Sequence, residues 1–201
     1  MSVSDDAPAP APSIADPGPL GLAAFALTTF LLSAKNAGWT GSDAWLGYAF
    51  AYGGFCQLLA GMWEFKNRNV FGATAFSTYG GFWIGLGIWA LTVMPKDPAA
   101  QVNNDLGWIL LAFAIFNTYM LIMSLGVNTA VFAVFLTLEI TEIVLFIGAF
   151  SGSASITKIG GIIGVITAVV AWYTSAAGVS NGIPGGKIRL PVGKALVSSA
   201  S

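Results

Sequence analysis

The sequence predicts an all-α integral membrane protein, and three observations support that prediction. Of its 201 residues, 56% are hydrophobic and 8% are charged, whereas a soluble domain carries roughly a quarter charged residues. Its mean hydropathy is +0.77. Long stretches without charge follow one another at 44–63, 69–95 and 106–138, and a helix needs roughly 20 mostly apolar residues to cross a bilayer.

Composition also excludes several function classes. A net charge of -1 without a basic patch argues against nucleic-acid binding. The single cysteine, Cys56, excludes an internal disulfide, and the lack of histidine removes the commonest metal ligand and general base. The sequence therefore predicts no metal site, no cofactor and no nucleic-acid partner. Membrane lipids, further subunits and small solutes remain as partners.

The chain divides into two tails and one transmembrane domain. Residues 1–19 are rich in Pro and Ala, contain three Asp and lack basic residues, so they predict a disordered acidic N-terminal tail rather than a secretory signal. Residues 20–178 form the transmembrane domain, and 179–201 predict a basic C-terminal tail. We expect a compact bundle of six transmembrane helices, at about 20–36, 44–65, 71–94, 106–125, 129–150 and 156–178.

The turn between the fourth and fifth helices is predicted at Gly126-Val127-Asn128, because one helix over 106–138 would overshoot the bilayer. Six spans place both termini on one side. Five basic residues then lie on that side and three on the other: Lys66, Arg68, Lys187, Arg189 and Lys194 against Lys35, Lys96 and Lys158. The positive-inside rule predicts cytoplasmic termini. We expect a multi-pass protein of the plasma membrane.

Glycine spacing predicts close helix crossings. Gly81 with Gly85, and Gly160 with Gly164, have the small-xxx-small spacing that lets two helix backbones approach.

Polar residues at membrane depth are costly and are therefore functional candidates. Most are neutral hydrogen-bonding groups, among them Thr28, Gln57 and Asn117. Glu139 and Glu142 are three residues apart and share a helix face, with no Lys or Arg inside the predicted span. Either one of them is protonated or both face water. A proton-linked role and hydrogen bonding at a helix or subunit interface both remain open.

A path lined by such groups suits a small monovalent anion or its neutral acid, since a multiply charged solute would lack a counter-charge. Two motifs are specific. DPGPLGLAAFALTT at 16–29 resembles the NPAPLGL signature of the acetate uptake transporter family, which includes succinate-acetate permeases. YGGFCQLLAGMWEFKNRNVFGATAFSTYGGFW at 52–83 is similar to that family's second and third helices. Asp16 and Gly18 depart from the signature.

The resemblance implies a six-helix protomer, a homo-hexamer with one path in each protomer, and passage of acetate and related short monocarboxylates, sometimes succinate. It also implies a hydrophobic constriction formed by Phe25, Tyr79 and Leu138. Gln57, Thr28 and Asn69 match family motifs near this constriction and, with Asn117, are expected along the substrate path. Asn69 is expected to cap the third helix toward the solute.

Three alternatives remain open at this stage. The path could be an anion channel or a proton-coupled symporter. The protein could instead be a non-transporting sensor or scaffold with the same fold. An intramembrane enzyme would have only Glu139 and Glu142 as an acid–base pair, without His, a metal site or a nucleophile motif, so the sequence predicts that the protein is not an enzyme.

Overall fold

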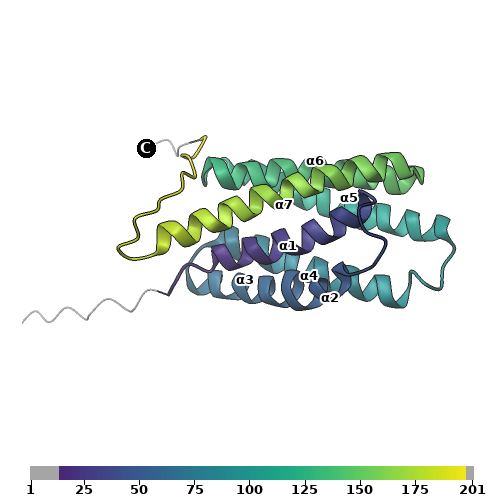
Figure 1. Cartoon of the computed structure of the whole chain (residues 1–201), viewed down its shortest axis with the longest axis horizontal. Helices are drawn as coiled ribbons and strands as arrows, with labels where there is room; N and C mark the ends of the chain where they lie inside the picture. Colours follow the sequence, from purple (N-terminus) through teal and green to yellow (C-terminus); the bar gives the residue numbers. More distant parts are fainter. Residues whose placement is uncertain (1–13, 198–201) are drawn as a thin grey trace, which may run out of the picture.

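The computed structural model describes residues 14–197, and every regular element in that range is a helix. In chain order these are α1 (Gly18–Asn36), α2 (Trp45–Phe50), the π-helix η1 (Ala51–Cys56), α3 (Gln57–Lys66), α4 (Val70–Thr92), α5 (Ala99–Ser124), α6 (Thr129–Ser151) and α7 (Ala154–Gly182). They run along the long axis of the molecule in one bundle (Figure 1). Residues 1–13 and 198–201 of the two predicted tails lie outside the described residues.

The predicted helix at 44–65 corresponds to α2, η1 and α3, which follow one another without a break. Its middle turn, AYGGFC, is π-helical, a distortion that often occurs at functional sites. Here it lies at a close helix crossing: a Cβ on Gly80 of α4 would stand 2.8 Å from Leu58 N and 3.0 Å from Gly54 O. Only glycine allows α4 to approach this segment so closely.

Two helices are longer than predicted. Helix α5 begins at Ala99 rather than near 106, directly after Pro98, and α7 extends to Gly182 rather than 178. Charged residues such as Asp105 indicate where a membrane ends, but a helix can continue into water beyond that point. The predicted turn before α6 is confirmed, because α5 ends at Ser124 and Asn128 caps α6, accepting from Val131 N at 2.9 Å.

Four described helices have both the length and the hydropathy to cross a bilayer: α1, α5, α6 and α7. Helix α4 has 23 residues, but its Gly, Ser, Thr and Tyr residues lower its hydropathy. The segment 45–66 is divided among three shorter elements. A bundle with these four helices is an integral membrane protein.

The start of α1 and the end of α7 lie together, as Figure 1 shows, and we call this end of the bundle the terminal end. There the Ser175 hydroxyl donates to Pro19 O at 2.6 Å. The C-terminal segment 183–197 folds back over this end instead of extending away as a free tail. Ala130 N donates to Val192 O at 2.9 Å, and the Tyr173 hydroxyl donates to Pro191 O at 2.7 Å. The opposite end is called the far end.

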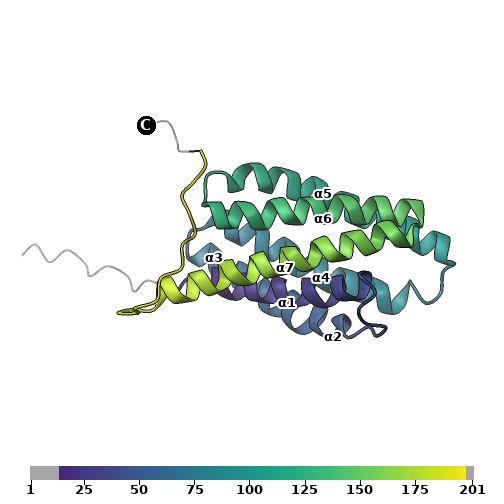
Figure 2. The ribbon, with the colours of Figure 1, turned by 45° about the horizontal axis from the view of Figure 1, so that its top comes forward.

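One of the two predicted glycine pairs makes close helix contacts. A Cβ on Gly160 would stand 2.6 Å from Leu145 Cδ2 of α6, and one on Gly164 would stand 3.1 Å from Ser33 Cβ of α1. Figure 2 shows α7 running beside both helices. Gly81 and Gly85 have no atom within 4 Å of such a Cβ in the described structure, so they face outward from the protomer.

Candidate functional site

A cavity lies at each end of the bundle. The terminal-end cavity has a volume of about 450 Å³ and is bounded by the starts of α1, α4 and α6 and the end of α7; its polar residues are Asp16, Glu64, Asn69, Asn128, Thr174 and Asn181. The far-end cavity has about 470 Å³, with polar residues Lys35, Asn36, Asn103, Ser153 and Thr157. The remaining lining of both cavities is mostly apolar.

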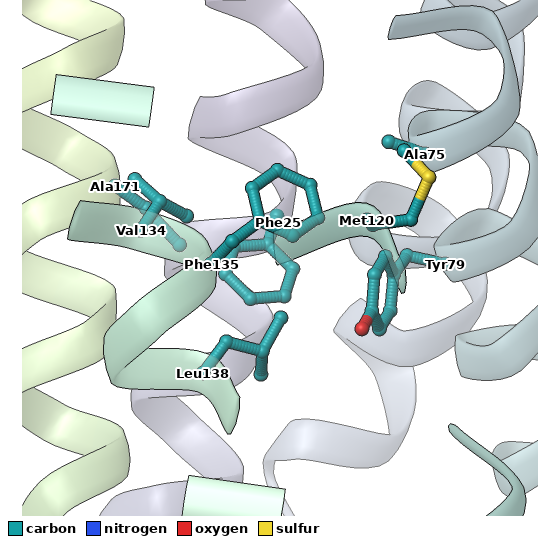
Figure 3. Close-up of a cluster of buried hydrophobic side chains, with 9 residues drawn as sticks. Phe25, Ala75, Tyr79, Met120, Val134, Phe135, Leu138 and Ala171 are labelled. Atoms are coloured by element: carbon teal, nitrogen blue, oxygen red, sulfur yellow. The ribbon is translucent and has the colours of Figure 1, made fainter. Parts of the chain in front are cut away.

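A layer of buried apolar side chains separates the two cavities. Phe25, Tyr79 and Leu138 belong to one cluster with Phe135 and Met120, and Figure 3 shows these side chains converging from different helices. The Phe25 and Tyr79 rings meet edge to face, with centroids 5.7 Å apart and planes at 64°. The structure therefore brings together the three residues predicted to form a constriction.

Sequence reasoning missed Phe135, which belongs to the same apolar layer and lines the terminal-end cavity. It lies one helical turn before Leu138, and the Phe71 ring packs edge to face on it at 5.2 Å. The i,i+3 spacing from Leu138 was the available signal, because residues at that spacing share a helix face.

A third, smaller cavity of about 50 Å³ lies on the far side of the apolar layer, and we call it the central chamber. Phe25, Tyr79 and Leu138 form part of its lining. Leu32, Asn36, Leu110 and Leu145 line both the chamber and the far-end cavity. The chamber is therefore the inward extension of the far-end cavity, up to the apolar layer.

The Tyr79 hydroxyl belongs to a buried polar network. The tyrosine oxygen lies 3.1 Å from Asn117 Oδ1 and 3.2 Å from Glu142 Oε1. Asn117 is fully buried, and its amide nitrogen donates to Phe135 O at 3.0 Å and to Glu139 Oε2 at 2.7 Å. With both amide hydrogens used, Asn117 Oδ1 needs a donor, which the Tyr79 hydroxyl can supply. The one hydrogen of the tyrosine hydroxyl is donated either to Asn117 Oδ1 or to Glu142 Oε1, one at a time.

The two glutamates have different surroundings although they share a helix face. Glu139 is half-buried, and its carboxylate accepts from Asn117 and, at 2.8 Å, from the Thr118 hydroxyl. Glu142 is 4% exposed, and its Oε2 has no hydrogen-bond partner among residues 14–197. In the same range the one ion pair joins Lys35 to Asp43, so neither glutamate is neutralised by a cation.

Of the four residues predicted along the substrate path, one lines a cavity and three do not. Asn69 lines the terminal-end cavity and caps α4, accepting from Gly72 N at 3.1 Å. Thr28, Gln57 and Asn117 are buried but line none of the three cavities. Thr28 donates to Ala24 O at 3.1 Å within its own helix. Sequence alone cannot tell a polar residue facing a path from one held between helices.

Among the described residues, no group of three or more His, Cys, Asp or Glu side chains comes together as metal ligands would. A helical bundle with a cavity at each end and an apolar layer between them is the arrangement of a membrane transport protein.

The chain matches the GPR1/FUN34/yaaH family over residues 2–183 and belongs to it. This match confirms the resemblance seen in residues 16–29 and 52–83. The family is one of transporters and channels rather than enzymes. Some fungal relatives are longer: the Saccharomyces cerevisiae protein called accumulation of dyads protein 2 is 41% identical, and the alignment covers 87% of this chain and 64% of that protein.

Two further relatives carry names that state a solute. Acetate permease A of Emericella nidulans is 41% identical, with 83% of this chain and 62% of that protein covered. The succinate-acetate/proton symporter SatP of Escherichia coli is 36% identical, with 90% and 96% covered. A solved structure of the bacterial acetate channel SatP superposes with a TM-score of 0.82 at 36% identity, covering 90% of this chain and 99% of that one.

Proposed function

We propose that this protein carries acetate and related short monocarboxylates, and by resemblance succinate, across the plasma membrane. It does so as a six-span protomer with cytoplasmic termini, assembled as a homo-hexamer with one path in each protomer. Two relatives named for acetate support the solute. Large apolar side chains on the outer helix faces, such as Ile115 and Met123, support contact with lipid or neighbouring subunits.

One observation carries the proposal. A single apolar cluster contributes Phe135 to the lining of the terminal-end cavity, and it contributes Phe25, Tyr79 and Leu138 to the lining of the chamber that continues into the far-end cavity. Bulky side chains at one level exclude water, whereas the Tyr79 hydroxyl offers one hydrogen bond. A solute with a methyl end and a carboxyl end suits such a constriction, because each end finds a matching surface.

The charges along the path favour a solute of low charge. The three cavities are lined by one basic residue, Lys35, and by three acidic residues, Asp16, Glu64 and Glu142. A dianion would meet more negative than positive charge. A monoanion moving through a channel and a monocarboxylate moving with a proton both fit this balance.

Uptake of labelled acetate into liposomes containing the purified protein tests the proposal. Phe25→Ala should increase uptake and also admit larger monocarboxylates such as butyrate, because it removes one ring of the constriction. Phe30→Ala is the matched control, since Phe30 lies on the same helix, packs against Trp172 with ring centroids 5.4 Å apart, and lines none of the cavities. Unchanged selectivity in Phe25→Ala would contradict the constriction.

Comparing liposomes that contain the unmodified protein with protein-free liposomes also tests the alternative that the protein senses or scaffolds without transport. That alternative requires that uptake by the unmodified protein equals uptake by protein-free liposomes at every acetate concentration.

A further inference from the structure

The central chamber contains unusual polar chemistry. Three residues of its lining carry a buried side-chain atom that has no hydrogen-bond partner among residues 14–197: Thr29 Oγ1, Trp83 Nε1 and Glu142 Oε2. The three residues are 6%, 3% and 4% exposed. Buried polar atoms are normally paired, so three unpaired ones around one cavity of about 50 Å³ indicate a binding site for a polar ligand.

The chemistry of these atoms selects the ligand. The Trp83 indole can only donate a hydrogen bond, and the Thr29 hydroxyl donates readily. Two unpaired donors on residues that line one small cavity suit a ligand group with two acceptor oxygens, such as a carboxylate. The volume has room for about four water-sized groups, and Phe25, Leu110 and Leu138 supply an apolar surface for a short hydrocarbon end.

Glu142 determines the charge state of such a ligand. No Lys or Arg is among the residues that line the chamber. An ionised Glu142 and an ionised ligand would place two negative charges in one buried site, and two carboxyl groups in that position retain one proton between them. The chamber therefore fits a carboxylate and a carboxylic acid that share one proton.

Few other titratable or charged groups face Glu142. Tyr79 of α4 approaches its Oε1 at 3.2 Å, and Glu139 lies one turn away on α6. From α5, the neighbouring polar group is the amide of Asn117, which is bonded to Tyr79 and Glu139. Helix α1 brings the hydroxyl groups of Thr29 and Ser33 to the chamber. Lys35 lines the adjoining far-end cavity, where it is paired with Asp43.

We propose that the central chamber binds the carboxylate end of a short monocarboxylic acid together with one proton, which the ligand shares with Glu142. Trp83 and Thr29 hold the ligand oxygens, and the proton passes between Glu142 Oε2 and one ligand oxygen without any other bond changing. The ligand and Glu142 together carry a charge of -1. This inference rests on the proposed transport function and specifies that the transported carboxylate moves with a proton.

Acetate uptake into proteoliposomes, measured over a range of acetate concentrations and imposed pH gradients, tests the two donors. Trp83→Phe retains a ring but removes the N–H, and Thr29→Val retains the shape but removes the hydroxyl. Each should raise KM about tenfold, since a hydrogen bond to a charged group contributes at least about 1.4 kcal/mol. Trp108→Phe is the control, because Trp108 is 61% exposed and lines none of the cavities.

The shared proton has its own test. Glu142→Gln cannot titrate, so uptake should no longer respond to an inward proton gradient. The control variant Asp105→Asn should respond as the unmodified protein does, because Asp105 lines none of the three cavities. Calorimetric titration of each purified variant with sodium acetate in detergent checks binding separately from transport. It also identifies any variant that has failed to fold.

Two failures can be distinguished. Absence of uptake by the unmodified protein contradicts the transport function itself. The second failure concerns the chamber alone. If the unmodified protein takes up acetate but KM is unchanged in Trp83→Phe and Thr29→Val and Glu142→Gln still responds to the proton gradient, the chamber site is overturned and transport stands. Loss of the proton response in Glu139→Gln but not in Glu142→Gln would also overturn it.

Discussion

Replacing Asn117 should destabilise the protein mainly through Glu139. Asn117 is fully buried and connects Tyr79, Phe135 O and Glu139 Oε2 at 3.1, 3.0 and 2.7 Å. In Asn117→Leu, Tyr79 keeps Glu142 as a partner and Phe135 O keeps its helix hydrogen bond. The largest loss is then the bond to the Glu139 carboxylate, about 2 kcal/mol, with about 1 kcal/mol for the weakened Tyr79 contact.

The expected loss is therefore about 3 kcal/mol, which for a chain of this size lowers the unfolding midpoint by about 6–12 °C. The assay is thermal unfolding in one detergent, followed by tryptophan fluorescence at a single scan rate. Asn104→Leu is the control on the same helix, because Asn104 is exposed, and its midpoint should change by about 2 °C or less.

A double-mutant cycle isolates the critical bond. In a Glu139→Leu background the charged acceptor is gone, so Asn117→Leu should now cost only about 1 kcal/mol, or about 2–4 °C. If Asn117→Leu lowers the midpoint equally in both backgrounds, the bond to Glu139 makes no net contribution, and the reasoning that this network holds α5 against α6 is refuted.

Three further predictions concern packing, capping and the C-terminal segment. Gly161→Ala should destabilise by about 1–3 kcal/mol, since its Cβ would stand 2.7 Å from Asn36 C, while Gly81→Ala, with no atom within 4 Å, should not; comparing their unfolding midpoints checks this. Asn128→Ala removes the cap on α6 and should lower the midpoint by about 2–4 °C, from a loss of about 1 kcal/mol. Tyr173→Phe removes the hydrogen bond to Pro191 O, so trypsin should cleave at Lys194 about fivefold faster, and an equal rate would show that the segment is held by its other contacts.

The sequence by itself determined the protein class and most of the helices. Few charges and long apolar stretches are enough to predict membrane-spanning helices. The reason is that every backbone polar group inside a bilayer must be hydrogen-bonded within a helix or a closed barrel. The break before α6 followed from Gly126-Val127-Asn128, since length and turn chemistry are local properties. The six-span count stays a prediction, because four described helices meet the length and hydropathy criteria.

Only the tertiary structure decided which polar residues share a cavity. Thr28, Gln57 and Asn117 have the composition of path residues but lie buried outside the three cavities, whereas Trp83, an aromatic residue in an apolar helix, lines the central chamber. It also separated Glu139, which accepts from two partners, from Glu142, whose Oε2 has none in the described chain. Spacing along one helix fixes a shared face, but the side chains that face it come from other helices, and packing alone decides which they are.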